Sequence, residues 1–220
     1  ITTLKTFYKF LCIEGILSDT PMRKVVHPKT EKNLPYFVDK NAMQELFDCL
    51  SFPDSFEGMR DRTMLLVFYC TGMRLSELTH LKTTDIDFYN NQLKVLGKRN
   101  KERLIPFGIE LRHAIQIYID ERKKISGDHN ILFITSKGEP IYDKLVYRVV
   151  NKYLGEVTTL EKKSPHVLRH TFATHLLNNG AEISAIKELL GHANLAATQV
   201  YAHTTFERLK TICNQAHPRA

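Results

Sequence analysis

The pattern of apolar and polar positions along this chain is mostly helical. Apolar residues recur every three or four positions and predict helices at about 39–50, 61–71, 76–81, 109–122, 142–153, 165–178, 184–190 and 205–215. Two alternating stretches, 92–97 and 103–106, predict strands on either side of a basic turn, and a further short strand is expected near 131–133. The pattern therefore predicts an α+β fold that is mainly α-helical with a small antiparallel β-sheet.

The first 35 residues differ from the remainder. Leu4, Phe7 and Leu11 form a helical apolar stripe that stops near Gly15 and is too short to be a domain. We interpret residues 1–20 as the C-terminal remnant of a helical domain, which agrees with a sequence that begins without Met. Residues 21–35 are basic and rich in turn formers, which is typical of an exposed linker, so the main domain is expected over residues 36–220.

Charge and cysteine content narrow the class of protein. Lys and Arg number 31 against 24 acidic residues, giving a formal charge of +7, which suits either a polyanionic partner or a basic surface kept for solubility. The four cysteines are scattered without a CxxC pair, so we expect neither a zinc site nor a disulfide framework, and a cytoplasmic location is the default. No apolar run approaches the roughly 20 residues of a membrane-spanning helix.

A first candidate site lies at the start of the helix predicted over 165–178. Ser164 is placed to cap this helix and Pro165 to open it, so His166 and Arg169 lie about one turn apart near its N-terminus. Free N–H groups and the helix dipole favour an anion there, and the guanidinium and imidazole complete a phosphate site. The alternative is a helix whose polar residues merely face water. The expected buried stripe consists of Leu168, Phe172 and Leu176.

A second candidate follows the helix predicted over 184–190, which Ile183, Ile186 and Leu190 are expected to anchor. Gly191 ends that helix and leaves His192 in a loop, and Tyr201 comes nine residues later. A tyrosine hydroxyl, with a pKa near 10, becomes a useful nucleophile only where cationic neighbours or a base assist it. Taken alone, Tyr201 is more simply explained as a packing residue.

A third candidate combines Arg74, just after the helix stop at Gly72, with Glu77 one turn further on. This carboxylate is placed to orient an arginine or a histidine, although an ordinary surface ion pair has the same spacing. The basic turn is either a solvated charge run or a tip that enters a DNA groove. Its cationic residues are Lys98, Arg99, Lys101 and Arg103.

Together these segments supply arginines, histidines, a lysine and a tyrosine, the inventory for metal-free attack on a phosphodiester. A zinc site built from the histidines lacks the HExxH pattern, so we expect no metal and no cofactor. In order along the chain the segments read TGMRLSEL, GKRNKERLIPFG, HVLRHTFATHLLNNG and LLGHANLAATQVYAH. This series resembles the tyrosine recombinase and phage integrase family, most of all its Xer-type recombinases, from about Leu34 to the end.

The resemblance assigns roles to particular residues. It implies that Arg74 and Arg169 are the catalytic arginines, and that Lys98 is the general acid. His166 and His192 would be the active-site histidines, Tyr201 the nucleophile and Glu77 a supporting residue. The basic turn itself, as a tip that enters a DNA groove, suggests Arg99, Lys101 and Arg103 as DNA-binding residues. The implied activity is site-specific cutting and rejoining of DNA through a 3′-phosphotyrosyl intermediate, without ATP.

The resemblance also implies partners and a preceding core-binding domain, of which residues 1–20 would be the end. The expected partners are double-stranded DNA with inverted-repeat half-sites and further protomers, dimer to tetramer, contacted through segment 203–216. Two alternatives remain open: a type IB topoisomerase that reseals the original strand, and a non-cutting architectural or regulatory DNA-binding protein.

Overall fold

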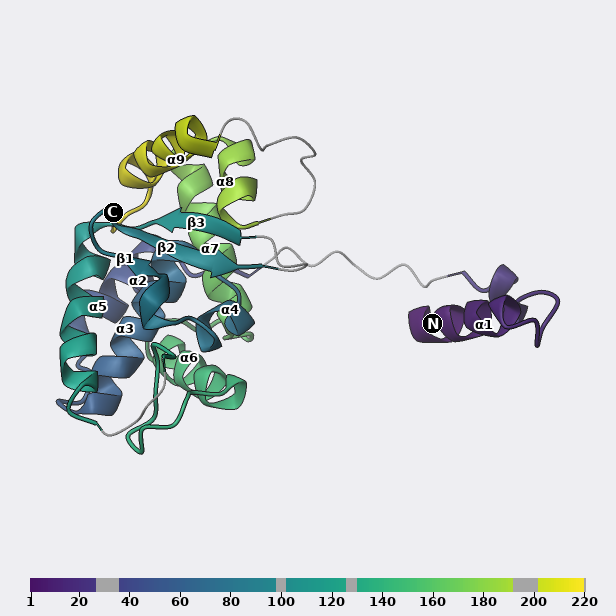
Figure 1. Cartoon of the computed structure of the whole chain (residues 1–220), viewed down its shortest axis with the longest axis horizontal. Helices are drawn as coiled ribbons and strands as arrows, with labels where there is room; N and C mark the ends of the chain where they lie inside the picture. Colours follow the sequence, from purple (N-terminus) through teal and green to yellow (C-terminus); the bar gives the residue numbers. More distant parts are fainter. Residues whose placement is uncertain (27–35, 98–101, 126–129, 192–201, 220) are drawn as a thin grey trace. The chain divides into compact units, whose positions relative to one another are not determined.

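The computed structural model describes residues 1–26, 36–97, 102–125, 130–191 and 202–219. It contains two compact units, Ile1–Leu34 and Pro35–Ala220 (Figure 1). In the first unit, α1 (Thr2–Ile13) precedes a short 3-10 helix, η1 (Pro21–Lys24). All of α1 is described and none of its residues is buried, and Leu4, Phe7 and Phe10 are each about half exposed. Whether residues 1–20 are the end of a larger domain stays a prediction.

The second unit begins with two helices whose ends follow from capping. The Asp39 carboxylate accepts a hydrogen bond from the Ala42 N–H (2.9 Å) and starts α2 (Lys40–Gln44), which continues as a π-helical turn, η2 (Glu45–Cys49). The next helix, α3 (Phe56–Thr71), starts five residues before the predicted position, because the Ser55 hydroxyl caps it by accepting from the Gly58 N–H (3.2 Å). It ends, as predicted, at Gly72, whose φ of 58° is left-handed.

The remaining helices lie close to the ranges predicted from periodicity. They are α4 (Leu75–Thr79), α5 (Ile109–Arg122), α6 (Asp143–Val157), α7 (Pro165–Asn178), α8 (Ile183–Leu189) and α9 (Ala202–Ala216). A 3-10 turn, η3 (Thr83–Asp85), was not predicted. Helix α3 is buried along most of its length and packs against α5 and α7, so it forms the centre of the core.

The predicted hairpin is confirmed and extended by one short strand. The antiparallel order is β1 (Ile86–Asp87), β2 (Gln92–Leu96) and β3 (Glu102–Pro106). The strand predicted near 131–133 is wrong: this stretch forms only an isolated bridge between Lys82 and Ile131, followed by a Leu132 N–H that donates to the Leu81 carbonyl (2.7 Å). Leu132 and Phe133 are fully buried, so a short apolar run here signals burial rather than strand pairing.

Two features of the fold bring the candidate site together. Helices α8 and α9 both contact β3, so the C-terminal part of the chain lies beside this strand of the hairpin (Figure 1). The stripe of α7 is buried as expected, with Leu168, Phe172 and Leu176 at 0% exposure. In α8, however, only part of the predicted anchor is correct, because Ile186 and Leu190 are buried whereas Ile183 is 58% exposed.

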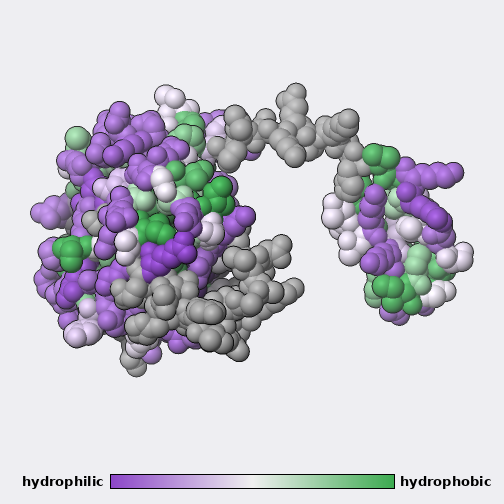
Figure 2. Space-filling model, turned by 90° about the horizontal axis from the view of Figure 1, so that it is seen from above, coloured by the Kyte–Doolittle hydropathy of each residue, from purple (hydrophilic) through white to green (hydrophobic). Residues whose placement is uncertain are grey.

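The surface of the larger unit is mostly hydrophilic on the face seen in Figure 2, with small separate apolar patches. Among the helices described here, none has both the length and the apolar character needed to cross a membrane. The fold class predicted from the sequence is confirmed: the described chain is mainly helical with a three-stranded antiparallel sheet.

Candidate active site

Arg74 occupies the turn between α3 and α4, where the left-handed Gly72 redirects the chain. Its backbone N–H donates to Glu77 Oε2 (2.7 Å) and its Nη1 donates to Glu77 Oε1 (2.9 Å). The Arg74 side chain is 26% exposed, whereas that of Glu77 is 3% exposed. Glu77 therefore holds Arg74 by both backbone and side chain, and part of the guanidinium still faces outward.

Glu77 is an ionised carboxylate at neutral pH despite its burial. Burial alone raises the pKa of a carboxyl group, but here the hydrogen bonds from Arg103 and from Arg74, with the charge of Arg103, lower the pKa of Glu77 to about 2. Glu77 thus supplies a fixed negative charge beneath the arginines. The burial of Glu77 excludes a solvent-exposed ion pair, and the supporting role that the resemblance implied for this residue stays a prediction.

Arg169 points from α7 into the interior and connects the end of α3 with the end of α8. Its Nη1 donates to the Gly72 carbonyl and its Nη2 to the Leu190 carbonyl, both at 2.7 Å. The residue is 9% exposed, and burial, together with the nearby charge of Arg74, lowers its pKa to about 10. It is consequently still a cation at neutral pH, and it lies close to Arg74.

Arg103 lies inside the site rather than on the surface of the hairpin. Its Nη1 and Nη2 form a fork with the two Glu77 oxygens (2.8 and 2.7 Å), and its Nε donates to the Leu189 carbonyl (2.9 Å). Only 11% of its side chain is exposed. The alternation of side chains along β3 could have indicated this burial from the sequence. Arg103 pairs with buried Val95 and is two residues from buried Ile105, so all three lie on the same face of the sheet.

The other predicted residues are distributed as follows. His166 is exposed in the first turn of α7, one turn from Arg169, and Ser164 occupies the N-cap position, although its side chain makes no capping hydrogen bond there. The remaining candidates lie outside the described residues: Lys98, Arg99, Lys101, His192 and Tyr201. The residue before His192, Gly191, is described, and its carbonyl accepts a hydrogen bond from Arg74 Nη2 at 3.4 Å. The chain therefore enters the segment of His192 next to Arg74.

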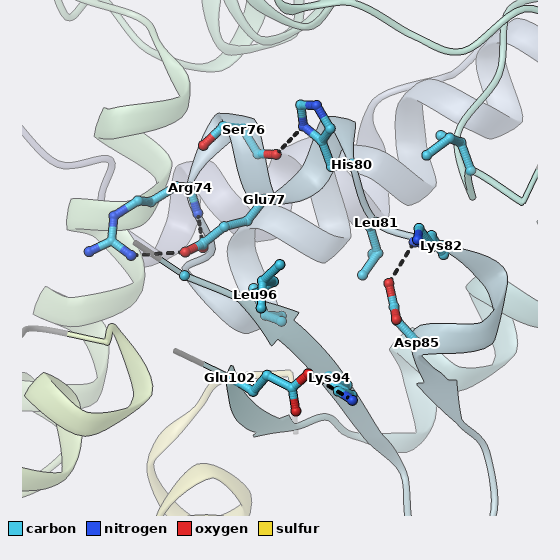
Figure 3. A pocket seen from close by; sticks show the side chains of 13 residues that line it. Arg74, Ser76, Glu77, His80, Leu81, Lys82, Asp85, Lys94, Leu96 and Glu102 are labelled. Atoms are coloured by element: carbon cyan, nitrogen blue, oxygen red, sulfur yellow. Dashed lines mark hydrogen bonds and ion pairs between the residues drawn. The ribbon is translucent and has the colours of Figure 1, made fainter. Parts of the chain in front are cut away.

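A pocket of about 670 Å³ opens beside Arg74, between α4, η3 and the β2–β3 hairpin. Figure 3 shows Arg74 and Glu77 on one side of it, with Lys82 and Asp85 on the other and the Lys94–Glu102 ion pair below. Three guanidinium groups and one carboxylate leave an excess of positive charge at the Arg74 end. A phosphate group can approach this end from solvent, where the partly exposed Arg74 guanidinium offers donors that a phosphate accepts.

Comparison with known proteins agrees with this geometry. The phage integrase family matches residues 37–208, and the chain therefore belongs to this family of tyrosine recombinases. Membership and relatives together identify it as a tyrosine-type site-specific DNA recombinase. The chain is 43% identical over 223 residues to tyrosine recombinase XerC of Staphylococcus aureus strain USA300, a match that spans all of this chain and 74% of the relative.

Two solved structures share the fold. The crystal structure of XerA recombinase superposes with a TM-score of 0.65 at 27% identity, covering 99% of this chain and 75% of XerA. The pre-cleavage complex of XerH site-specific recombinase bound to difH substrate has a TM-score of 0.67 at 25% identity, covering 88% and 57%. Recombinases with this fold are therefore seen on DNA, which supports DNA binding by this chain.

Proposed function

We propose that this recombinase cleaves one DNA strand at a time, with Tyr201 as the nucleophile and Arg74 and Arg169 as the phosphate clamp. The observation that carries the proposal is the convergence of both arginines on one turn and one helix end, with an excess of positive charge beside an open pocket. Positively charged donors placed in advance around a phosphate stabilise the charge that develops as it is attacked. His166, one turn from Arg169, is placed at the edge of the same region.

The proposed steps balance without an external energy source. The Tyr201 hydroxyl oxygen attacks the phosphorus, the bond from phosphorus to the 5′-oxygen breaks, and a 3′-phosphotyrosyl link forms. Lys98 gives a proton to the departing 5′-oxygen, while His166 and His192 hold the phosphate and accept the tyrosine proton. A 5′-hydroxyl from a partner strand then attacks the phosphotyrosine and gives its proton to Lys98, while the departing Tyr201 oxygen recovers the proton taken by the histidines. One phosphodiester therefore replaces another.

We propose further that the DNA target carries inverted-repeat half-sites and that several protomers assemble on it, dimer to tetramer. Segment 203–216 is the proposed contact. In the structure, α9 packs on its own chain through Leu209, Cys213 and Ala216, which are buried. A contact between protomers would therefore use the exposed side of α9, at Arg208, Asn214 and Gln215, or require the helix to leave its place.

The domain arrangement proposed with this function has three parts. Residues 1–20 are the end of a core-binding domain, 21–35 are a linker, and 36–220 form the catalytic domain. The exposed apolar side chains of α1 support the first part, and the change of unit between Leu34 and Pro35 supports a boundary before the catalytic domain. The XerC relative is longer than this chain, so the experiments below use the full-length protein.

The test is covalent trapping on nicked duplexes tiled from the protein's own genome, followed by a denaturing gel. The nick lets the cleaved piece diffuse away, so the adduct accumulates. Tyr201→Phe removes only the attacking oxygen, and Tyr89→Phe, at a tyrosine that is 93% exposed in the turn after β1, is the matched control. An adduct that maps to Tyr201, disappears in Tyr201→Phe and persists in Tyr89→Phe supports the proposal. Specific binding without adduct on any duplex contradicts it and favours a non-cutting regulator.

Strand transfer distinguishes a recombinase from a type IB topoisomerase. Two duplexes that carry the trapped site, labelled with different dyes, are incubated with the wild-type protein. Products that carry both labels indicate exchange between duplexes, whereas relaxation of supercoiled DNA without doubly labelled products indicates resealing of the original strand. Cross-linking of wild type on DNA with one and with two half-sites measures the number of protomers.

A further inference from the structure

Three consecutive carbonyl groups at the end of α8 are each held by a different arginine. The Leu189 carbonyl accepts from Arg103 Nε (2.9 Å) and the Leu190 carbonyl from Arg169 Nη2 (2.7 Å). The Gly191 carbonyl accepts from Arg74 Nη2 at 3.4 Å. The last carbonyls of a helix have no partner within the helix and carry partial negative charge, so three cations are favoured here. The chain beyond this point leads to His192 and Tyr201.

Among these arginines, Arg103 has the fewest donors left for a ligand. Its Nη1 and Nη2 both bind Glu77, its Nε binds Leu189, and 11% of its side chain is exposed. Arg74 is more open, at 26% exposure, and its contact with Gly191 is the longest of the three. Arg103 is thus built into the protein, whereas Arg74 is available to a phosphate.

Gly191 shows how closely Arg103 and the end of α8 are fitted. Gly191 has a φ of 65°, and a Cβ placed on it would lie 3.1 Å from Arg103 Cδ and 3.2 Å from its Nη1. A side chain at position 191 would therefore push against Arg103 as well as strain the backbone. Because Gly191 immediately precedes His192, the position of Arg103 is coupled to the start of the segment that bears the nucleophile.

We propose that Arg103 is a positioning residue for strand cleavage, which acts on the reaction through Glu77, Arg74 and the end of α8 without touching DNA. This inference rests on the proposed function. It replaces the DNA-binding role that the basic hairpin suggested for this residue. The fork on Glu77 fixes the carboxylate that orients Arg74, and the bond to Leu189 fixes the point from which the catalytic segment departs.

The expected size of the effect follows from how strongly cleavage depends on geometry. A displacement of about 1 Å in a catalytic group can slow a reaction roughly 100-fold, even when the altered residue is distant from the chemistry. Lysine cannot reproduce the planar fork of arginine and has no Nε donor for Leu189. We therefore expect both Arg103→Gln and Arg103→Lys to slow cleavage by about 10-fold to 100-fold at saturating DNA.

The experiment measures single-turnover cleavage and DNA affinity separately. The probe is the nicked duplex found by covalent trapping, and the protein is full length. We expect Arg103→Gln to slow adduct formation while the dissociation constant stays within about twofold and the slope of log affinity against log salt does not change. Removal of a DNA-contacting arginine would instead weaken affinity and make that slope shallower by about 0.9 for each phosphate that is no longer neutralised.

Arg112→Gln is the matched control for a merely structural effect. Arg112 is also partly buried and donates to the Phe88 carbonyl (2.7 Å) and to Asn91 Oδ1 (2.9 Å), away from the candidate site. We expect this variant to lose thermal stability without slowing cleavage at saturating DNA. Equal slowing in Arg112→Gln and Arg103→Gln would overturn the positioning role.

A chemically altered substrate tests whether Arg103 acts through the arginine clamp. A methylphosphonate at the scissile position lacks one negatively charged oxygen and therefore depends less on the guanidinium groups. The cleavage defect of Arg103→Lys should shrink at least several-fold on this substrate, as should that of Arg74→Gln. The inference is overturned if Arg103→Lys has no cleavage defect, or if its defect is equal on both substrates. Arg103→Lys alone provides the test if Arg103→Gln does not fold. Failure of the wild type to form an adduct would instead contradict the proposed function.

Discussion

Replacing Glu77 by Gln tests how much the buried carboxylate stabilises the fold. The change keeps the size of the side chain but removes its charge, and it replaces one of the two oxygens that accept from Arg74 and Arg103 by an amide NH2 group, which cannot accept. A carboxyl whose pKa falls from 4.5 to about 2 on folding is favoured in its ionised form by roughly 3 kcal/mol at neutral pH. Solvent at the open Arg74 side screens part of this, so we expect Glu77→Gln to lower the free energy of unfolding by about 2–3 kcal/mol.

The pH dependence of this difference has a definite sign. Because the pKa of Glu77 is lower in the folded chain than in the unfolded chain, its stabilisation is complete above about pH 4.5 and is lost as the pH falls towards 2. The difference in unfolding free energy between wild type and Glu77→Gln should therefore be largest at pH 7. It should fall to less than half of that value by about pH 3.

The assay is urea-induced unfolding followed by circular dichroism, since the chain contains no tryptophan. Glu102→Gln is the matched control, because Glu102 pairs with Lys94 at a similar distance (2.9 Å) but both side chains are about half exposed. We expect Glu102→Gln to lower the free energy of unfolding by less than about 1 kcal/mol. If Glu77→Gln costs no more than Glu102→Gln, or if its effect does not diminish in acid, the assignment of Glu77 as a buried, arginine-held carboxylate is wrong.

Three further predictions concern the fold and DNA binding. In Gly72→Ala the new Cβ would lie 2.4 Å from Phe172 Cδ1, on a residue whose φ is 58°. We expect this variant to lose about 2 kcal/mol or more of unfolding free energy, measured by thermal unfolding. The control Gly155→Ala places a Cβ in open space on α6 and should be neutral or slightly stabilising. Burial lowers the pKa of His217 from 6.5 to about 4, so the wild type should lose stability as the pH falls from 6.5 towards 4. If the slope of unfolding free energy against pH is unchanged in His217→Gln, this residue is not the cause. Affinity for the trapped duplex should fall steeply with salt, and a flat response in a filter-binding titration would contradict a phosphate-based contact.

Much of the fold was predictable because its signals are local. The bounds of α5 and α7 agree with the predicted ranges, and α3 ends at Gly72 as predicted. Apolar spacing, a helix-opening proline and a helix-ending glycine all act within one or two turns. The hairpin was predictable for the same reason. The strand expected at 131–133 and the burial expected of Ile183 were wrong, because an apolar residue does not specify what will cover it.

The candidate site was also predictable only in part. The sequence alone indicated the family, because four motifs in a fixed order are specific to it, and through that resemblance it proposed which residues carry the chemistry. It also suggested a link between Arg74 and Glu77, which are one helical turn apart. It did not indicate the partners of Arg103, which are two residues distant in the chain, Glu77 and Leu189.

The sequence by itself therefore determined the family, the fold class and the inventory of reactive groups, since each is written in short patterns of spacing and residue type. Only the tertiary structure decided which cations lie inside and which remain open. Helix α8 packs against β3, so that the carbonyls of residues 189–191 meet arginines from β3, α7 and the turn before α4. Burial of Glu77 and the sharing of its charge arise from the same packing, because long-range contacts, not local periodicity, set the dielectric and the partners of an ionised group.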